Sequence, residues 1–255
     1  MSETTPRRVA ARAALVTGAG SGIGRDTAML LAESGYAVAL LGRTAETLES
    51  AATLIREEVD PEARLLVLPA DAADPAAVDA AVASVVEAFG RLDAVVNAAG
   101  QAPLAPVERI ENAELDNCLN VNLKALVYLA RAAWPRFREN DKAAPGGASG
   151  GGVLVGVSAM AVHTPHQRFS FYAAAKAGVE AFVANAATEG QRLGIRCHAV
   201  APGAVETPLL RGNFSERAIP PEKALDPISV AGVIHDLVTG EREEPSGSTV
   251  KLPSP

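Results

Sequence analysis

The stretch ALVTGAGSGIGRDTAMLLAESG (residues 14–35) passes from an apolar strand through a glycine-rich turn into a helix. Its glycines do not fit the common dinucleotide fingerprint G-x-G-x-x-G in any register. Gly18, Gly22 and Gly24 still allow a tight turn and the close approach of a pyrophosphate to the helix N-terminus. A glycine turn without a ligand is the alternative. The place of this turn, after the first strand of an α/β pattern, favours phosphate binding.

The rest of the chain repeats the alternation of apolar strand and amphipathic helix. One helix is predicted after Asp74-Pro75, an N-cap followed by proline at the first helical position, and it should end at Gly90. The alternation predicts an α/β fold of the Rossmann type, a doubly wound and mostly parallel seven-stranded sheet with helices on both faces. The expected strands are Ala13–Thr17, Ala37–Leu41, Leu65–Leu68, Ala94–Asn97, Val153–Val157, Arg196–Val200 and Thr249–Leu252.

Length and composition narrow the class of protein. The 255 residues are expected to form one domain, with residues 1–10 flexible and the glycine-rich stretch 144–152 as a surface loop. Lysine and arginine number 23 against 30 acidic residues, a net charge of −7 that argues against a nucleic-acid partner. No apolar run approaches the roughly 20 residues that span a membrane. Two cysteines without metal-ligand spacing, Cys118 and Cys197, indicate a reduced, cytoplasmic protein.

The sequence FYAAAK (171–176) predicts a helix on which Tyr172 and Lys176 share one face. A lysine beside a tyrosine stabilises the phenolate and lowers the pKa of the phenol, which makes it a better general acid or base near neutral pH. An ordinary surface pair of an aromatic and a charged residue is the alternative reading of these six residues.

Four motifs together resemble the short-chain dehydrogenase/reductase family. They are TGAGSGIG (17–24), NAAG (97–100), YAAAK (172–176) and APGAVETP (201–208), in the family's order and over nearly the whole chain. The resemblance implies an oxidoreductase that transfers a hydride between NADP(H) and a carbonyl/secondary alcohol pair. It also implies a homodimer or homotetramer acting on a small molecule, with no metal, nucleic-acid or membrane partner. A nucleotide-binding sensor or scaffold protein on the same fold is the alternative function.

The resemblance also implies roles for four residues. Tyr172 is the catalytic acid or base, and Lys176 tunes it and holds the cofactor ribose. Asn122 links the lysine to solvent through water. The family's serine usually precedes the tyrosine by thirteen residues, but Ala159 stands there and Ser158 lies fourteen before Tyr172. We expect Ser158 to take this role across a loop one residue longer; absence of the serine is the alternative.

The cofactor preference is predicted at the end of the second strand. Gly42 stands where NAD-dependent members usually carry an acid, and Arg43 next to it can pair with the 2′-phosphate of NADP. The resemblance assigns to the cofactor Gly18, Ser21, Gly22, Ile23, Gly24, Arg43, Asp71, Asn97, Gly100, Tyr172, Lys176, Pro202, Gly203 and Thr207.

Three segments are expected to shape the substrate pocket. These are the residues from Gln101 onward, the loop 159–171 and the segment 208–224. Arg168, Arg211 and Phe214 are candidate substrate contacts within the last two, and ordinary loop residues in the alternative reading. His163 and His166 lack the further ligands that a metal site needs. Turn and cap roles are the alternatives for Asp71 and Thr207.

Overall fold

The computed structural model describes residues 11–140 and 151–255, so the expectations for residues 1–10 and for most of 144–152 lie outside it. Seven strands form one sheet in the order β3-β2-β1-β4-β5-β6-β7, and every neighbouring pair runs parallel. The strands are β1 (Ala13–Thr17), β2 (Ala37–Gly42), β3 (Leu65–Pro69), β4 (Ala94–Asn97), β5 (Val153–Val157), β6 (Arg196–Pro202) and β7 (Thr249–Leu252). The predicted doubly wound sheet is confirmed.

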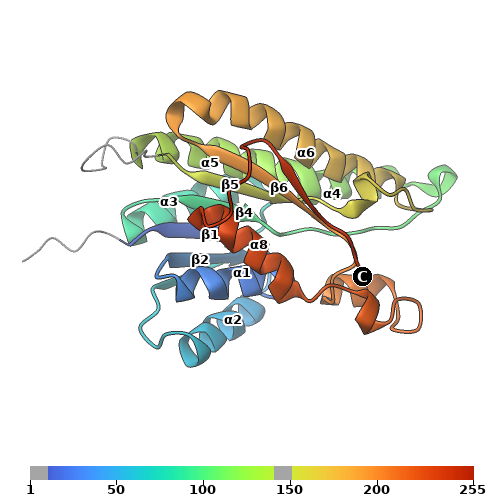
Figure 1. Cartoon of the computed structure of the whole chain (residues 1–255), viewed down its shortest axis with the longest axis horizontal. Helices are drawn as coiled ribbons and strands as arrows, with labels where there is room; N and C mark the ends of the chain where they lie inside the picture. The colour runs from blue at the N-terminus through green and yellow to red at the C-terminus, as the bar shows by residue number, and fades with distance from the viewer. Residues whose placement is uncertain (1–10, 141–150) are drawn as a thin grey trace, which may run out of the picture.

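Helices cover both faces of this sheet (Figure 1). One face packs against α3, α5 and α6 and the other against α1, α2 and α8, each through its own apolar core. The helices are α1 (Gly22–Glu33), α2 (Ala45–Glu58), α3 (Pro75–Phe89), α4 (Asn112–Leu119), α5 (Ala125–Asn140), α6 (Ser170–Gly190), α7 (Pro208–Asn213) and α8 (Pro227–Thr239). Burial on both sides explains why β1, β4 and β5 are apolar or nearly so along their whole length.

The predicted helix signals are found in α3. The Asp74 side chain accepts a hydrogen bond from the amide of Ala76 at 2.9 Å, which satisfies one free donor of the first turn. Gly90 ends the helix with a positive φ of 80°, a conformation that glycine adopts without steric cost. Three strands run one or two residues beyond their predicted ends, at Gly42, Pro69 and Pro202.

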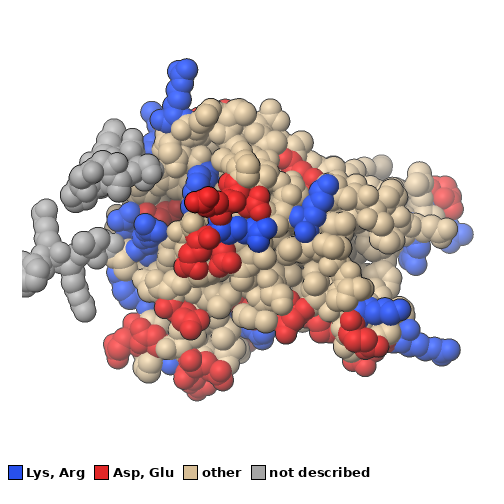
Figure 2. All heavy atoms as spheres, in the orientation of Figure 1, with Lys and Arg blue, Asp and Glu red and all other residues tan. Residues whose placement is uncertain are grey.

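The order of the strands reverses between β1 and β4. In an open parallel sheet this point leaves a crevice at the carboxyl ends of the strands, where ligands bind. Basic and acidic side chains are interspersed on the face seen in Figure 2, with no continuous basic area there. Within the described part of the chain, no helix combines the length and apolar character needed to cross a bilayer.

Candidate active site

The glycine turn lies in the crevice and is built for close backbone contacts. Gly18 has a φ of 66°, and a Cβ there would meet the amide nitrogen of Ala99 at 2.9 Å. A Cβ on Gly24 would collide with the carbonyl oxygen of Gly18, and Gly22 has a φ of 52°. A larger residue at Gly18 or Gly24 would therefore require the backbone at the ends of β1 and β4 to move, and one at Gly22 would require the Thr207 side chain to move.

A hydrogen-bonded brace joins those two strand ends. The Thr17 hydroxyl donates to Asn97 Oδ1 at 2.7 Å and accepts from the amide of Ala99 at 3.1 Å. Thr17 and Asn97 are both buried. Asn97 therefore acts as a structural support beneath the crevice and lines neither of the two cavities described next.

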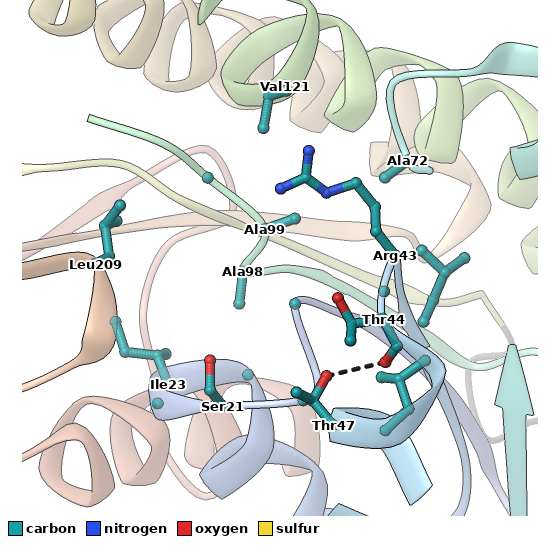
Figure 3. A pocket seen from close by; sticks show the side chains of 18 of the residues that line it. Ser21, Ile23, Arg43, Thr44, Thr47, Ala72, Ala98, Ala99, Val121 and Leu209 are labelled. Carbon is teal, nitrogen blue, oxygen red and sulfur yellow. Dashed lines mark hydrogen bonds between the residues drawn. The ribbon is translucent and has the colours of Figure 1, made fainter. Parts of the chain in front are cut away.

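A cavity of about 290 Å³ follows the glycine turn toward the end of β2. Figure 3 shows Arg43 extending from the end of β2 toward the middle of this cavity, on the side opposite Ser21 and Ile23. Of the residues assigned to the cofactor, those that line it are Gly18, Ser21, Gly22, Ile23, Gly24, Arg43, Asp71, Gly100 and Thr207. The glycines leave open space beside the backbone, next to the N-terminus of α1 and the Arg43 side chain. This arrangement fits the phosphates of a dinucleotide.

Asp71 and Thr207 each have a local structural role as well. Asp71 Oδ1 accepts from the amide of Ala73 at 2.9 Å, as a turn residue does. Thr207 is the N-cap of α7, because its hydroxyl oxygen accepts from the amide of Leu210 at 3.3 Å. Both residues also line the cavity, so the turn and cap roles are compatible with the predicted contacts to the cofactor.

A second cavity, of about 710 Å³, adjoins the first. The two share five lining residues, which are Ile23, Ala98, Gly100, Thr207 and Leu209. The predicted site residues Ser158, Tyr172, Lys176, Pro202 and Gly203 line the second cavity. A ligand reaching from the glycine turn past Gly100 would therefore enter the space beside the tyrosine and the lysine.

Tyr172 and Lys176 lie together on α6, as the helical spacing predicts. The lysine Nζ is 5.9 Å from the centre of the tyrosine ring and donates to the carbonyl of Val157 at 2.7 Å. Burial lowers the pKa of Lys176 to about 8. Burial also raises the pKa of Tyr172 above its ordinary value, which is opposite to the lowering expected from the neighbouring lysine.

Asn122 is fixed beside this pair by a break in the helix. Five residues form a π-helical turn, η2 (Asn120–Lys124), between α4 and α5. The Asn122 amide donates to the carbonyls of Gln101 and Cys118 at 2.9 and 3.0 Å, and its Oδ1 accepts from the amide of Gln101 at 3.2 Å. A Cβ added to Gly100 would lie 3.1 Å from Asn122 Oδ1 and 3.4 Å from Lys176 Nζ, so both side chains flank this glycine.

Ser158 is buried, and its hydroxyl is engaged by α6. Its Oγ lies 2.6 Å from Glu180 Oε1 and 3.2 Å from the carbonyl of Lys176. Since a hydroxyl has one proton, the shorter bond to the carboxylate takes it. In the part of the chain that the structure describes, no hydrogen bond joins Ser158 to Tyr172. Ala159 lies beside Tyr172 in one small apolar cluster and also lines the second cavity.

Glu180 is a site residue that the sequence reasoning did not identify. Its side chain is only 15% exposed and bridges Ser158 and His163, whose Nε2 lies 3.1 Å from the same oxygen. Its position four residues after Lys176 places it on the same helix face, on a largely apolar helix. This spacing of four residues from Lys176 was the signal in the sequence that could have identified Glu180. Its partners could not be predicted, since they lie on the strand end and loop before α6.

The remaining candidates for substrate contacts differ in whether they line the second cavity. Phe214 lines the second cavity, whereas Arg168 and Arg211 do not. Arg168 donates to the carbonyl of Leu104 at 3.2 Å, and Arg211 forms an ion pair with Glu206. His163 is not part of any triad of metal-ligating side chains in the described residues.

One such triad, His235, Asp236 and Glu241, brings its donor atoms within 4.8 Å of one another. Both histidine nitrogens already bond, however, to Ser34 and Asp236.

Comparison with known proteins places the chain in a family. The family model of the short chain dehydrogenases matches residues 12–218. Levodione reductase of Leifsonia aquatica is 34% identical over 206 residues, which are 80% of this chain and 73% of that protein. The short chain dehydrogenase/reductase astE of Aspergillus oryzae is 34% identical over 212 residues, 83% of this chain and 77% of that protein.

Solved structures agree with this placement. The crystal structure of levodione reductase has a TM-score of 0.85 at 29% identity and covers 96% of this chain and 97% of its own. That of 3-ketoacyl-(acyl-carrier-protein) reductase from Brucella melitensis, complexed with NADH, has a TM-score of 0.83 at 29% identity, with 95% and 96% covered. The chain belongs to the short-chain dehydrogenase/reductase family. It is an NAD(P)-dependent oxidoreductase of that family.

Proposed function

We propose that this enzyme transfers a hydride between NADP(H) and a carbonyl/secondary alcohol pair. The observation that carries the proposal is the junction of the two cavities. The first fits the dinucleotide, and the second, which shares Gly100 with the first, is lined by Tyr172 and Lys176. When bound, the nicotinamide cofactor supplies or accepts the hydride.

Tyr172 donates the proton to the carbonyl oxygen in the reducing direction. Because burial raises its pKa, the phenol is protonated at neutral pH and able to donate. Lys176, with a pKa of about 8, is mostly cationic at pH 7 and stabilises the negative charge that forms on the tyrosine oxygen. Asn122, held rigidly by Gln101 and Cys118, provides the amide beside the lysine that would link it to solvent through water.

In this proposal Ser158 orients the substrate oxygen, and that role carries a condition. The Ser158 hydroxyl, which donates to Glu180 in this structure, must donate to the substrate oxygen instead, because a hydroxyl has only one proton. Ser158→Ala and Ala159→Ser test this role as a pair. If Ser158 acts directly, Ser158→Ala lowers kcat and Ala159→Ser does not raise it. A gain on Ala159→Ser with no loss on Ser158→Ala would remove Ser158 from the catalytic set.

The preference for NADP rests on Arg43. The Arg43 side chain lines the first cavity, and position 42 is glycine, so no acidic side chain there repels a 2′-phosphate. Arg43→Ala should weaken NADPH binding and leave NADH binding nearly unchanged. Fluorescence titration with both cofactors measures the ratio, and an unchanged ratio would refute the role of Arg43.

The decisive assay follows NADPH oxidation with a panel of ketones. Tyr172→Phe should abolish turnover while NADPH still binds. Tyr128→Phe is the matched control, since Tyr128 lies on α5 against Arg131 and lines neither cavity. If the unmodified enzyme binds NADPH but turns over no carbonyl or alcohol, the sensor or scaffold function is favoured instead.

The proposal also includes a cytoplasmic location and a homodimer or homotetramer. The two buried, unpaired cysteines support a reducing compartment. Light scattering of the full chain at micromolar concentration measures the assembly, and a strictly monomeric species would contradict that part of the proposal.

A further inference from the structure

Two phenylalanines from separate segments form an aromatic wall beside the catalytic tyrosine. Phe169 precedes α6 and Phe214 follows α7, and their rings stack with centres 6.2 Å apart and planes at 7°. Phe169 also meets the Tyr172 ring edge-on at 5.9 Å. Both phenylalanines line the second cavity and are only partly buried, so their ring surfaces are available to a ligand.

We propose that the second cavity selects uncharged, cyclic ketones, whose ring lies against the wall formed by Phe169 and Phe214. This inference rests on the proposed carbonyl chemistry of Tyr172 and adds the substrate class. A carbonyl oxygen at the Tyr172 hydroxyl brings the neighbouring part of the substrate next to Phe169, because the two rings touch. A flat or cyclic substrate covers the aromatic rings and has few rotatable bonds, so its binding loses little conformational entropy.

The remaining walls of the cavity are mainly apolar. They include Met160, Val205, Leu209, Leu210 and Ile219. Burial of an alicyclic body against such side chains contributes roughly 25 cal/mol per Å² of apolar area. The volume of about 710 Å³ is large enough for more than one fused ring.

The charges around the cavity disfavour ionic substrates. No acidic side chain is among the described residues that line it, so no side chain there would pair with a cationic amine. Lys176 and Lys223 are the lining residues with a full positive charge. Lys176 is already bonded to Val157, and Lys223 is exposed at the rim, where water screens it.

The two nearby arginines do not line the cavity, and each has a partner elsewhere. Arg211 is paired with Glu206, and Arg168 donates to the backbone of Leu104. A carboxylate or phosphate entering the cavity would lose hydration, and the buried cation that it meets among the described lining residues, Lys176, already donates to Val157. An uncharged substrate avoids this cost.

The aromatic wall is held in place from both sides. Arg168 has a φ of 71°, unusual for a residue other than glycine, and its carbonyl accepts from the amide of Ala105 at 3.1 Å, directly before Phe169. On the other side, Arg211 donates to the carbonyls of Phe214 and Ile219 at 3.4 and 2.9 Å. A wall fixed before the substrate arrives favours rigid substrates that match it.

The test compares matched ketones with saturating NADPH. 2-Decalone and 2-decanone have the same carbon number, and we expect the cyclic ketone to have a kcat/KM at least about tenfold higher, equivalent to roughly 1.4 kcal/mol. 4-Methylcyclohexanone should likewise exceed 4-oxocyclohexanecarboxylate. Phe214→Ala and Phe214→Leu should both reduce the ratio of cyclic to acyclic kcat/KM toward one, whereas Val107→Ala, at a residue 73% exposed and outside the cavity, should not.

The possible results distinguish a wrong substrate class from a wrong proposed reaction. Equal kcat/KM for decalone and decanone, or for the charged and uncharged ketone, would overturn the substrate class and leave the carbonyl chemistry intact. A ratio unchanged in both Phe214 variants would remove the aromatic wall as its cause. No reduction of any ketone, with NADPH still bound, would overturn the proposed function itself.

Discussion

Replacement of His198 by leucine should remove much of the acid sensitivity of this fold. His198 lies on β6 and is fully buried, and neither ring nitrogen has a hydrogen-bond partner among the described residues. Burial, with a smaller contribution from Arg196, lowers its pKa from 6.5 to about 4, while Glu244 acts weakly in the opposite direction. The neutral imidazole is therefore the form that the folded chain accommodates.

The sign and size of the effect follow from proton linkage. The folded pKa lies below the unfolded one, so the unfolded chain binds more protons between pH 6.5 and 4, and stability falls as the pH falls through that range. At about 1.36 kcal/mol per pKa unit, the full loss is about 3 kcal/mol, most of it reached by pH 4.5. This loss is an upper limit, because relaxation of the fold around a protonated ring reduces it.

Urea denaturation at several pH values between 7 and 4.5 measures the loss. The free energy of unfolding of the unmodified chain should drop by about 2 to 3 kcal/mol more than that of His198→Leu. The other titrating groups are common to both proteins, so the difference between the two profiles isolates His198. Parallel profiles, within about 0.5 kcal/mol, would show that His198 is not the source of the acid sensitivity.

Three further predictions concern the site. Gly18→Ala should lower the free energy of unfolding by roughly 2 kcal/mol and weaken NADPH binding, since φ is 66° there; calorimetry and titration check both, and an unchanged Tm would contradict it. As the pKa of Lys176 is about 8, kcat/KM should fall between pH 7 and 9, and Lys176→Arg should flatten that limb; a flat profile for the unmodified enzyme would count against the lysine charge. Arg211→Ala should raise KM for ketones without changing NADPH affinity, because it frees the segment carrying Phe214; equal effects on both ligands would point to general destabilisation.

The fold could be predicted because its signals are local. The apolar run of β1, the glycines after it and the Asp74 cap each act within a few residues, and their order along the chain defines a parallel sheet. The neighbouring faces of Tyr172 and Lys176 follow from helical spacing alone. The predictions of the sheet, of the glycine turn and of the helix face shared by Tyr172 and Lys176 are therefore correct in outline.

The parts that escaped prediction depend on contacts between distant segments. The bond between Ser158 and Glu180 joins a strand end to a helix, and the stacking of Phe169 on Phe214 joins two loops. Neither pairing has a spacing that could be read along the chain. The direction of the Tyr172 pKa shift was also predicted wrongly, because the sequence shows the neighbouring lysine but not the burial that raises this pKa.

The position of residues 253–255 has a practical consequence. Pro253 and Pro255 line the second cavity, and Ser254 between them accepts a hydrogen bond from the amide of Ala204 at 2.7 Å. A change at Pro253, Ser254 or Pro255 would thus act on the second cavity itself. Since β1 begins at the amino ends of the parallel strands, opposite the crevice (Figure 1), affinity handles and surface immobilisation belong at the amino-terminal side.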